Sequence, residues 1–210
     1  MKPLLLDWAA TLVSYFLLGL IRILTGSQAR WWGCPPKAEQ RIYFANHQSH
    51  ADLVMIWAAL PKELRRSVRA VAARDYWTKT PFRQWLTTAV FNVIYVSRER
   101  HGDEDPLEPL IEAMRAGDSL ILFPEGTRGY QDEPQAFKAG LYNLALKFPA
   151  VELIPAWINN VQRVMPKGEV VPVPVLCSVT FGAPMQVLPG EERQAFLARA
   201  RDAVIGLRQV

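Results

Sequence analysis

The sequence contains few of the residues on which metal, redox and disulfide sites depend. Its 210 residues include only two cysteines, Cys34 and Cys177, and only three histidines. The cysteines lie far apart and match no metal-binding or redox spacing, so we interpret both as free thiols in a reducing compartment. The sequence also has no internal repeat, no low-complexity tract and no Gly-x-Ser-x-Gly turn. The absence of that turn argues against the serine-nucleophile chemistry of α/β-hydrolases.

The sequence also lacks an uncharged stretch long enough to cross a membrane. Residues 8–21 carry no charge, but Asp7 and Arg22 bound them, and fourteen residues fall short of the roughly 20 that span the hydrocarbon. No small-residue cleavage site follows, which argues against a secretory signal. We expect a helix that lies in the membrane interface, ends near residues 26–27 and precedes a Trp pair, 31–32, at the lipid headgroups. A spanning helix and a buried core helix are the alternatives.

The composition favours an anionic partner with an apolar environment. Half of the residues are hydrophobic, seven are tryptophan, and the net charge is +4. Between residues 62 and 83, seven basic side chains accompany only two acidic ones, with Trp77 among them and Trp85 two residues beyond. This cluster suits an acidic lipid surface, because basic residues are drawn to anionic headgroups and Trp concentrates at the interface. Nucleic acid ranks lower because no recognition motif is present; a solvated helix face is the plain alternative.

Short apolar runs alternate with segments of helical pattern along the chain. Strands are expected at 41–45, 68–73, 92–97, 119–123, 151–158 and 175–181, and helices at 52–60, 76–90, 107–116, 139–148 and 191–207. This alternation predicts an α/β fold with a mostly parallel sheet flanked by helices. We divide the chain into an N-terminal membrane-interacting helical segment, 1–32, and one domain, 33–210, which is long enough for a substantial core.

A polar stretch, Asn46 to Asp52, separates the first strand from the helix that follows it. In that turn Asp52 can reach the ring of His47, hold one ring nitrogen as N–H and leave the other free to take a proton. Alternatively, Asp52 only caps the helix, and His47 and His50 are ordinary turn residues. A metal-dependent hydrolase is a third reading. It is short of ligands, since the remaining histidine, His101, lies in a charged loop.

Cations and a carboxylate follow two other strands. Glu125 and Arg128 come directly after the fourth strand, Arg98 ends the third, and Lys138 begins a helix. Because the carboxyl ends of parallel strands share one edge, these side chains would converge near His47. Guanidinium groups and a helix N-terminus both suit phosphate oxygens. Taken singly, each is more simply a solvated or salt-bridged side chain.

Together these blocks resemble the glycerolipid acyltransferase family, which includes 1-acylglycerol-3-phosphate acyltransferases. His47 and Asp52 match the family's His–four residues–Asp motif, and residues 125–128 match its Glu-Gly-Thr-Arg motif. Residues 95–98 keep the arginine of a third block but have serine where aspartate is common, and residues 153–156 resemble a fourth block. The motifs occur in the family's order within roughly the middle of the chain.

The resemblance implies a membrane-associated transferase of phospholipid biosynthesis. The acyl donor would be acyl-CoA or an acylated acyl carrier protein, and the acceptor would be the free hydroxyl of a lysophosphatidic acid-like molecule. His47, oriented by Asp52, would be the general base for direct attack on the thioester, with main-chain N–H groups near the histidine turn stabilising the oxyanion. Glycerol-3-phosphate or another lysophospholipid is the alternative acceptor. No cofactor and no metal are expected.

The resemblance also implies an acceptor site and a location. The implied substrate-binding residues are Arg98 and Arg128 for the phosphate, Glu125 and Gly126 along the glycerol, and Thr127 and Lys138 as supporting contacts. His50 keeps a structural role. The expected location is the cytoplasmic face of the inner or cytoplasmic membrane, with membrane lipid as a partner and no nucleic acid. A non-catalytic lipid-binding module is the alternative from another functional class.

Overall fold

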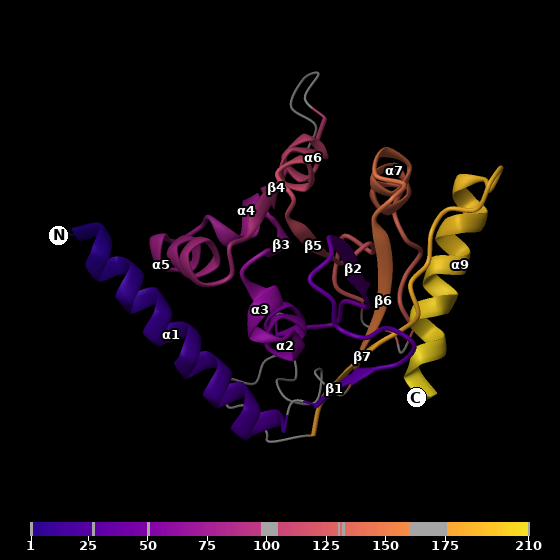
Figure 1. The fold of residues 1–210 in the computed structure, drawn as a ribbon. Coiled ribbons are helices and arrows are strands. Elements are labelled where there is room, and N and C mark those ends of the chain that lie inside the picture. Colours follow the sequence, from indigo (N-terminus) through magenta and orange to yellow (C-terminus); the bar gives the residue numbers. More distant parts are fainter. Residues whose placement is uncertain are drawn as a thin grey trace.

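The computed structural model describes residues 2–26, 28–49, 51–97, 105–129, 131, 133–159 and 176–209. Four residues singled out from the sequence lie outside these ranges: Ser27, His50, Arg98 and His101. Within them the chain forms a largely parallel sheet with helices on both faces (Figure 1). The α/β fold predicted from the alternation of strands and helices is therefore confirmed.

Seven strands are hydrogen-bonded in the order β1-β7-β6-β2-β5-β3-β4. They are β1 (Gln28–Trp31), β2 (Arg41–Ala45), β3 (Val68–Ala73), β4 (Ile94–Val96), β5 (Ser119–Leu122), β6 (Glu152–Asn159) and β7 (Ser178–Phe181). β6 and β7 pair antiparallel, and the other five neighbouring pairs are parallel. The carboxyl ends of the five parallel strands β6, β2, β5, β3 and β4 therefore lie at one edge of the sheet. Sites of α/β proteins are built at this edge.

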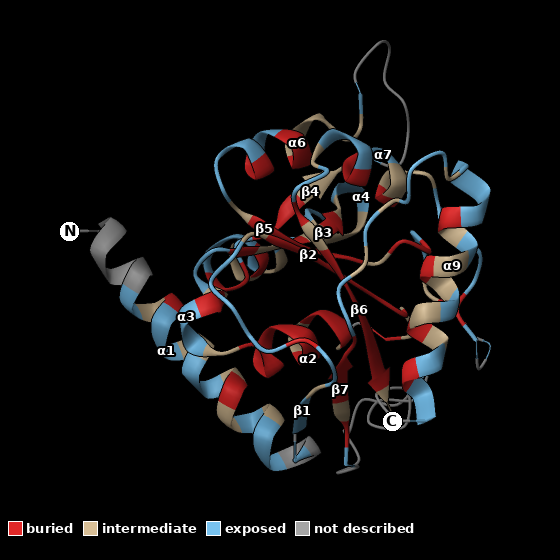
Figure 2. Ribbon diagram, turned by 45° about the vertical axis from the view of Figure 1, so that its right-hand side comes forward, coloured by how far each residue is buried: buried red, intermediate tan, exposed pale blue. Residues whose placement is uncertain are grey.

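Helices and helical turns connect these strands. They are α1 (Lys2–Thr25), α2 (Asp52–Ala59), α3 (Lys62–Arg65), α4 (Arg74–Trp77), α5 (Pro81–Trp85), the π-helical turn η1 (Leu86–Val90), α6 (Glu108–Arg115), α7 (Gly140–Lys147), α9 (Arg193–Gly206) and the 3₁₀ turn η2 (Leu207–Gln209). Proline begins α5 and stands near the start of α6, where a missing N–H costs nothing. In Figure 2 the central strands are largely buried, whereas the edge strand β1 and the outer sides of α1 and α9 are exposed.

The central strand β2 separates two hydrophobic cores. Tyr43 and Ala45 belong to the core that contains α2, whereas Ile42 and Phe44 belong to the core that contains α6, α7 and α9. All five residues of β2 are buried. Because side chains alternate across a strand, a strand buried on both faces is largely apolar, and its one charged residue, Arg41, forms an ion pair at the start of the strand. β2 is therefore a rigid support for the polar turn that follows it.

Helix α1 lies along one side of the domain, against α2 and η1 (Figure 1). Its 24 residues extend beyond the expected segment 8–21 at both ends. Ala10 and Leu18 are buried on the inner side of this helix. Within the part of the chain that the structure describes, no helix combines the length and the apolar character that crossing a bilayer requires.

Trp31 lies in a strand that the sequence did not predict. It belongs to β1 and stacks on Phe181 of β7 with ring centroids 4.1 Å apart. Its expected place at the lipid headgroups stays a prediction. Trp32 next to it is exposed. The run Gln-Ala-Arg-Trp alternates polar and apolar residues over only four positions, and this short pattern directly after the N-terminal helix was not predicted as a strand. The division between residues 32 and 33 stays a prediction, and β1 precedes it within the same sheet.

Candidate active site

His47 and Asp52 form the hydrogen-bonded pair that their spacing predicts. Nδ1 of His47 lies 2.9 Å from Oδ2 of Asp52, whose side chain is 1% exposed. The same oxygen accepts the main-chain N–H groups of Gln48 at 2.6 Å and Ser49 at 2.8 Å. Asp52 thus closes the turn and orients the imidazole at once. With Nδ1 held by the carboxylate, Nε2 is the nitrogen that remains for proton transfer.

The ring of His47 is also held on its face. It stacks on Phe123, which follows β5, with ring centroids 4.4 Å apart and an angle of 21° between the planes. The side chain is 22% exposed, so one part of the ring stays open. An aromatic neighbour and a carboxylate fix both the tilt and the rotation of the imidazole, which a general base needs in order to meet its substrate.

Asn46 ties the start of the turn to β6. Its amide oxygen accepts the N–H of Ile158 at 2.8 Å, and its amide nitrogen donates to the carbonyl of Ile158 at 3.1 Å. Asn46 is 1% exposed. The side chain replaces the sheet hydrogen bonds that β2 gives up where its backbone leaves the sheet. Buried N–H and C=O groups require such partners.

Glu125 is buried and bonded to main-chain donors. Oε1 accepts the N–H of His47 at 2.7 Å, and Oε2 accepts the N–H of Gln135 at 2.8 Å. The residue is 2% exposed. Burial raises the pKa of this carboxyl, while its two N–H donors act in the opposite direction. Gly129 completes the contact between the loops by donating its N–H to the carbonyl of His47 at 2.7 Å.

The main-chain N–H groups beside the histidine are already engaged. Those of His47, Gln48 and Ser49 all donate to carboxylate oxygens of Glu125 or Asp52. We expected an oxyanion donor among the main-chain groups of this turn. The structure uses these three to hold carboxylates, so the expected donor is not one of these three N–H groups.

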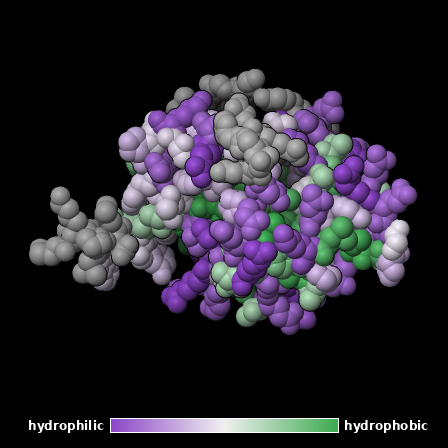
Figure 3. Space-filling model, turned by 90° about the horizontal axis from the view of Figure 1, so that it is seen from above, coloured by the Kyte–Doolittle hydropathy of each residue, from purple (hydrophilic) through white to green (hydrophobic). Residues whose placement is uncertain are grey.

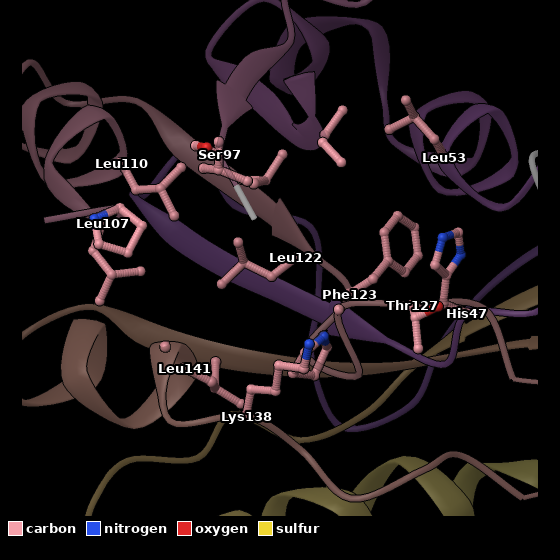
Figure 4. A pocket seen from close by; sticks show the side chains of 18 of the residues that line it. His47, Leu53, Ser97, Leu107, Leu110, Leu122, Phe123, Thr127, Lys138 and Leu141 are labelled. Atoms are coloured by element: carbon pink, nitrogen blue, oxygen red, sulfur yellow. The ribbon is translucent and has the colours of Figure 1, made fainter. Parts of the chain in front are cut away.

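A cavity of about 440 Å³ opens beside His47. Figure 4 shows His47 and Thr127 at one end and Leu107 and Leu110 at the other, with Leu122 between them. The apolar side chains in its wall come from α2, β3, β4, β5, α6 and α7: Leu53, Val71, Val96, Leu107, Leu110, Leu122, Leu141 and Leu144. Seen from above, apolar side chains gather towards the middle of the molecule and hydrophilic ones surround them (Figure 3). The cavity suits a hydrocarbon chain whose polar end lies at His47.

Two cations line the same cavity. Arg128 and Lys138 contribute to its wall together with Gly126 and Thr127, as the convergence of strand ends predicts. Gly126 has a φ of 69°, and a Cβ there would lie 2.7 Å from Nζ of Lys138. Glycine therefore allows both the left-handed turn and the passage of the lysine over it. Arg98, predicted beside them, lies outside the described residues.

Sequence reasoning left several residues of this site without a role. Asn46 was read only as part of a polar turn, and Phe123 only as the end of a strand. Trp77, interpreted as part of a basic membrane surface, lines the cavity with Tyr76. No sequence signal distinguishes these roles, because each depends on a partner far along the chain. Among the described residues, no group of three or more His, Cys, Asp or Glu side chains is arranged to hold a metal ion.

Comparison with known proteins agrees with this geometry. The Acyltransferase family model matches residues 35–159, more than half of the chain. The 1-acyl-sn-glycerol-3-phosphate acyltransferase of Borreliella burgdorferi is 30% identical over 151 residues, which cover 70% of this chain and 55% of that protein. The human 1-acyl-sn-glycerol-3-phosphate acyltransferase alpha is 27% identical over 137 residues, which cover 64% and 46%. The chain thus spans about half the length of these relatives.

A solved structure supports the fold. The 1-acyl-sn-glycerophosphate acyltransferase of Thermotoga maritima superposes with a TM-score of 0.73 and 21% sequence identity, over 100% of this chain and 82% of that one. The matched family segment runs from just before β2 to the end of β6 and so contains the His47–Asp52 pair, Glu125 to Arg128 and Lys138. On this match, the chain belongs to the Acyltransferase family.

Proposed function

We propose that this chain transfers a fatty acyl group from an acyl thioester to the free hydroxyl of a lysophosphatidic acid-like acceptor. Nε2 of His47 takes the hydroxyl proton while the oxygen attacks the thioester carbonyl. The tetrahedral intermediate then collapses, the carbon–sulfur bond breaks, and the thiol leaves with the proton that His47 returns. Asp52 keeps Nδ1 protonated and stabilises the imidazolium that forms between these steps.

One observation carries this proposal: a histidine–carboxylate pair stands where an apolar cavity meets two cations. The 2.9 Å contact between Nδ1 of His47 and Oδ2 of Asp52 supplies an oriented base. The leucine-lined part of the cavity suits an acyl chain. Arg128 and Lys138 suit an acceptor that carries a phosphate. Relatives named as 1-acyl-sn-glycerol-3-phosphate acyltransferases favour the same acceptor.

We also propose that α1 holds the protein in the membrane interface, on the cytoplasmic face. Its outer side presents large exposed side chains: Trp8, Leu12, Tyr15, Phe16, Leu20 and Ile23. Such a face binds at the boundary between headgroups and acyl chains. Of the basic cluster between residues 62 and 83, Lys62, Arg66, Arg74 and Lys79 are exposed and available to anionic lipid. Arg65 instead lies over the ring of Trp57.

An acyl-transfer assay over a panel of acceptors and donors tests the function. Purified protein is incubated with lysophosphatidic acid, glycerol-3-phosphate and neutral or zwitterionic lysolipids, each with acyl-CoA and with acyl carrier protein loaded with the same chain. We expect transfer to lysophosphatidic acid from at least one donor, and the donor arms decide which thioester is used. No transfer to any acceptor, with the fold intact, would contradict the proposal.

A further inference from the structure

Glu125 belongs to the motif that places Arg128 in the cavity, yet its own side chain is turned away from it. Pro124, Gly126, Thr127 and Arg128 all line the cavity, whereas Glu125 is absent from its wall and is 2% exposed. The resemblance assigned this carboxylate to the acceptor's glycerol. A side chain so enclosed has no surface to offer an acceptor.

Both oxygens of Glu125 already have donors. Oε1 accepts from the N–H of His47 at 2.7 Å, and Oε2 accepts from the N–H of Gln135 at 2.8 Å. Hydrogen bonds to an ionised carboxylate are stronger than those between neutral groups. The two main-chain donors bond to different oxygens, and a carboxamide has an NH₂ group in place of one of them, which cannot accept. The residue type is therefore explained by these two donors without any ligand.

The loop that carries Glu125 forms hydrogen bonds with both main-chain groups of His47, its N–H and its carbonyl. The N–H of His47 is held by Glu125, and its carbonyl accepts the N–H of Gly129 at 2.7 Å. Arg128 lies directly before Gly129, so the contact that fixes the base also fixes the segment bearing the cation. These two hydrogen bonds fix the position of the turn after β2 relative to the loop after β5.

We propose that Glu125 is a positioning residue, which sets His47 and Arg128 in register and does not contact the acceptor. The expected effect of Glu125 on turnover rests on the proposed function. Its hydrogen bond to the N–H of His47 does not depend on that function. A misplacement of a catalytic group by about 1 Å can lower the rate on the order of 10²-fold.

The kinetic test compares Glu125→Gln with Arg128→Ala and with Glu133→Gln. Glu133 lies on the same loop, is exposed and pairs with Arg201 at 2.9 Å, so it receives the same substitution without touching His47. For Glu125→Gln we expect kcat to fall on the order of 10²-fold, with a smaller rise in the acceptor KM because the segment that bears Arg128 also shifts. For Arg128→Ala we expect the acceptor KM to rise, and for Glu133→Gln neither value should change. A raised acceptor KM with unchanged kcat in Glu125→Gln would overturn the assignment.

Two measurements on the His47 main-chain amide separate this proposal from the function itself. In wild-type protein we expect its proton to exchange with solvent at least about 10²-fold more slowly than an exposed amide, because it donates to a buried carboxylate. In Glu125→Gln we expect its NMR resonance to move upfield, and in Glu133→Gln to stay. Exchange at the exposed rate in the wild type would overturn the assignment even if the variant failed to fold. A protein without transferase activity would still show slow exchange of the His47 amide and its shift in Glu125→Gln. Failure of the proposed function can therefore be told apart from failure of the Glu125 assignment.

Discussion

Each contact of His47 restricts a different motion of its side chain or main chain. Asp52 fixes the rotation of the ring through Nδ1, Phe123 covers one face, and Glu125 and Gly129 hold the peptide at its two ends. In its proposed role as the base, an imidazole held in this way needs little reorganisation when a substrate arrives. The acceptor side is more open, since Thr127 and Lys138 are exposed. Changes to the two sides should therefore have different kinetic signatures.

Arg128→Ala tests the acceptor side at the residue scale. If the guanidinium binds the acceptor phosphate in the ground state, its removal should raise the acceptor KM more than it lowers kcat. Steady-state kinetics with varied acceptor and saturating donor measure the two effects. Lys37→Ala removes a cation before β2, at the opposite edge of the sheet, and should change neither. An unchanged acceptor KM in Arg128→Ala would contradict phosphate binding by this residue.

Gly126→Ala separates backbone strain from the displacement of Lys138. A φ of 69° disfavours alanine by about 1–2 kcal/mol, and the new Cβ would also displace Nζ of Lys138. Gly190 has a φ of 73° with no atom close to its Cβ position, so Gly190→Ala carries the strain alone. We expect both variants to melt at a lower temperature and only Gly126→Ala to raise the acceptor KM. An unaltered KM in Gly126→Ala would remove Lys138 from the acceptor site.

The elements near the site follow the predictions closely, because their patterns are local. β3 has the predicted bounds, Val68–Ala73, and α2 begins at Asp52 as expected. The region 76–90 was predicted as one helix broken near Pro81, and it is divided into α4, α5 and η1. β1 was missed because its pairing depends on β7, about 150 residues further along the chain. An alternation of four residues is too short to predict a strand by itself, and the partner strand that completes it lies outside any local pattern.

The site shows the same division between local and distant signals. The contact between His47 and Asp52 was predictable because five residues in a turn bring them together. The bond of Glu125 to the N–H of His47 joins positions 78 residues apart, and that of Asn46 to Ile158 joins positions 112 apart. Main-chain groups carry no residue identity, so no sequence motif indicates that they are the partners.

Helix α1 carries the prediction at the scale of elements. Replacing Trp8 and Phe16 by serine removes two exposed apolar side chains, 65% and 68% exposed, each of which would contribute roughly 1.5–3 kcal/mol when buried in lipid. We expect binding to anionic vesicles, measured by flotation, to weaken by tenfold or more. Leu188→Ser, at an exposed leucine outside α1, is the matched control and should bind as the wild type does. Equal retention of both variants would place the membrane contact on another surface.

At the scale of the whole molecule, the two cysteines report on the integrity of the core. Cys34 and Cys177 are both buried, and burial raises the pKa of the Cys177 thiol from 9.0 to about 11. The thiolate is the reactive form, so its fraction at pH 8 should be on the order of 10²-fold lower in the folded chain than in the unfolded one. We expect slow labelling by a thiol reagent that accelerates with denaturant at the unfolding transition. Fast labelling of Cys177 in native buffer would contradict its burial in the core.

The central claim concerns the whole protein: the chain catalyses acyl transfer with His47 as the base, and is not only a carrier of lipid. The most direct test measures acyl transfer to lysophosphatidic acid and binding of the same lipid, side by side, in the wild type and in His47→Ala. We predict that His47→Ala loses about 10²–10⁴-fold in turnover and still binds the lipid with nearly wild-type affinity. Turnover that survives the substitution would contradict the account.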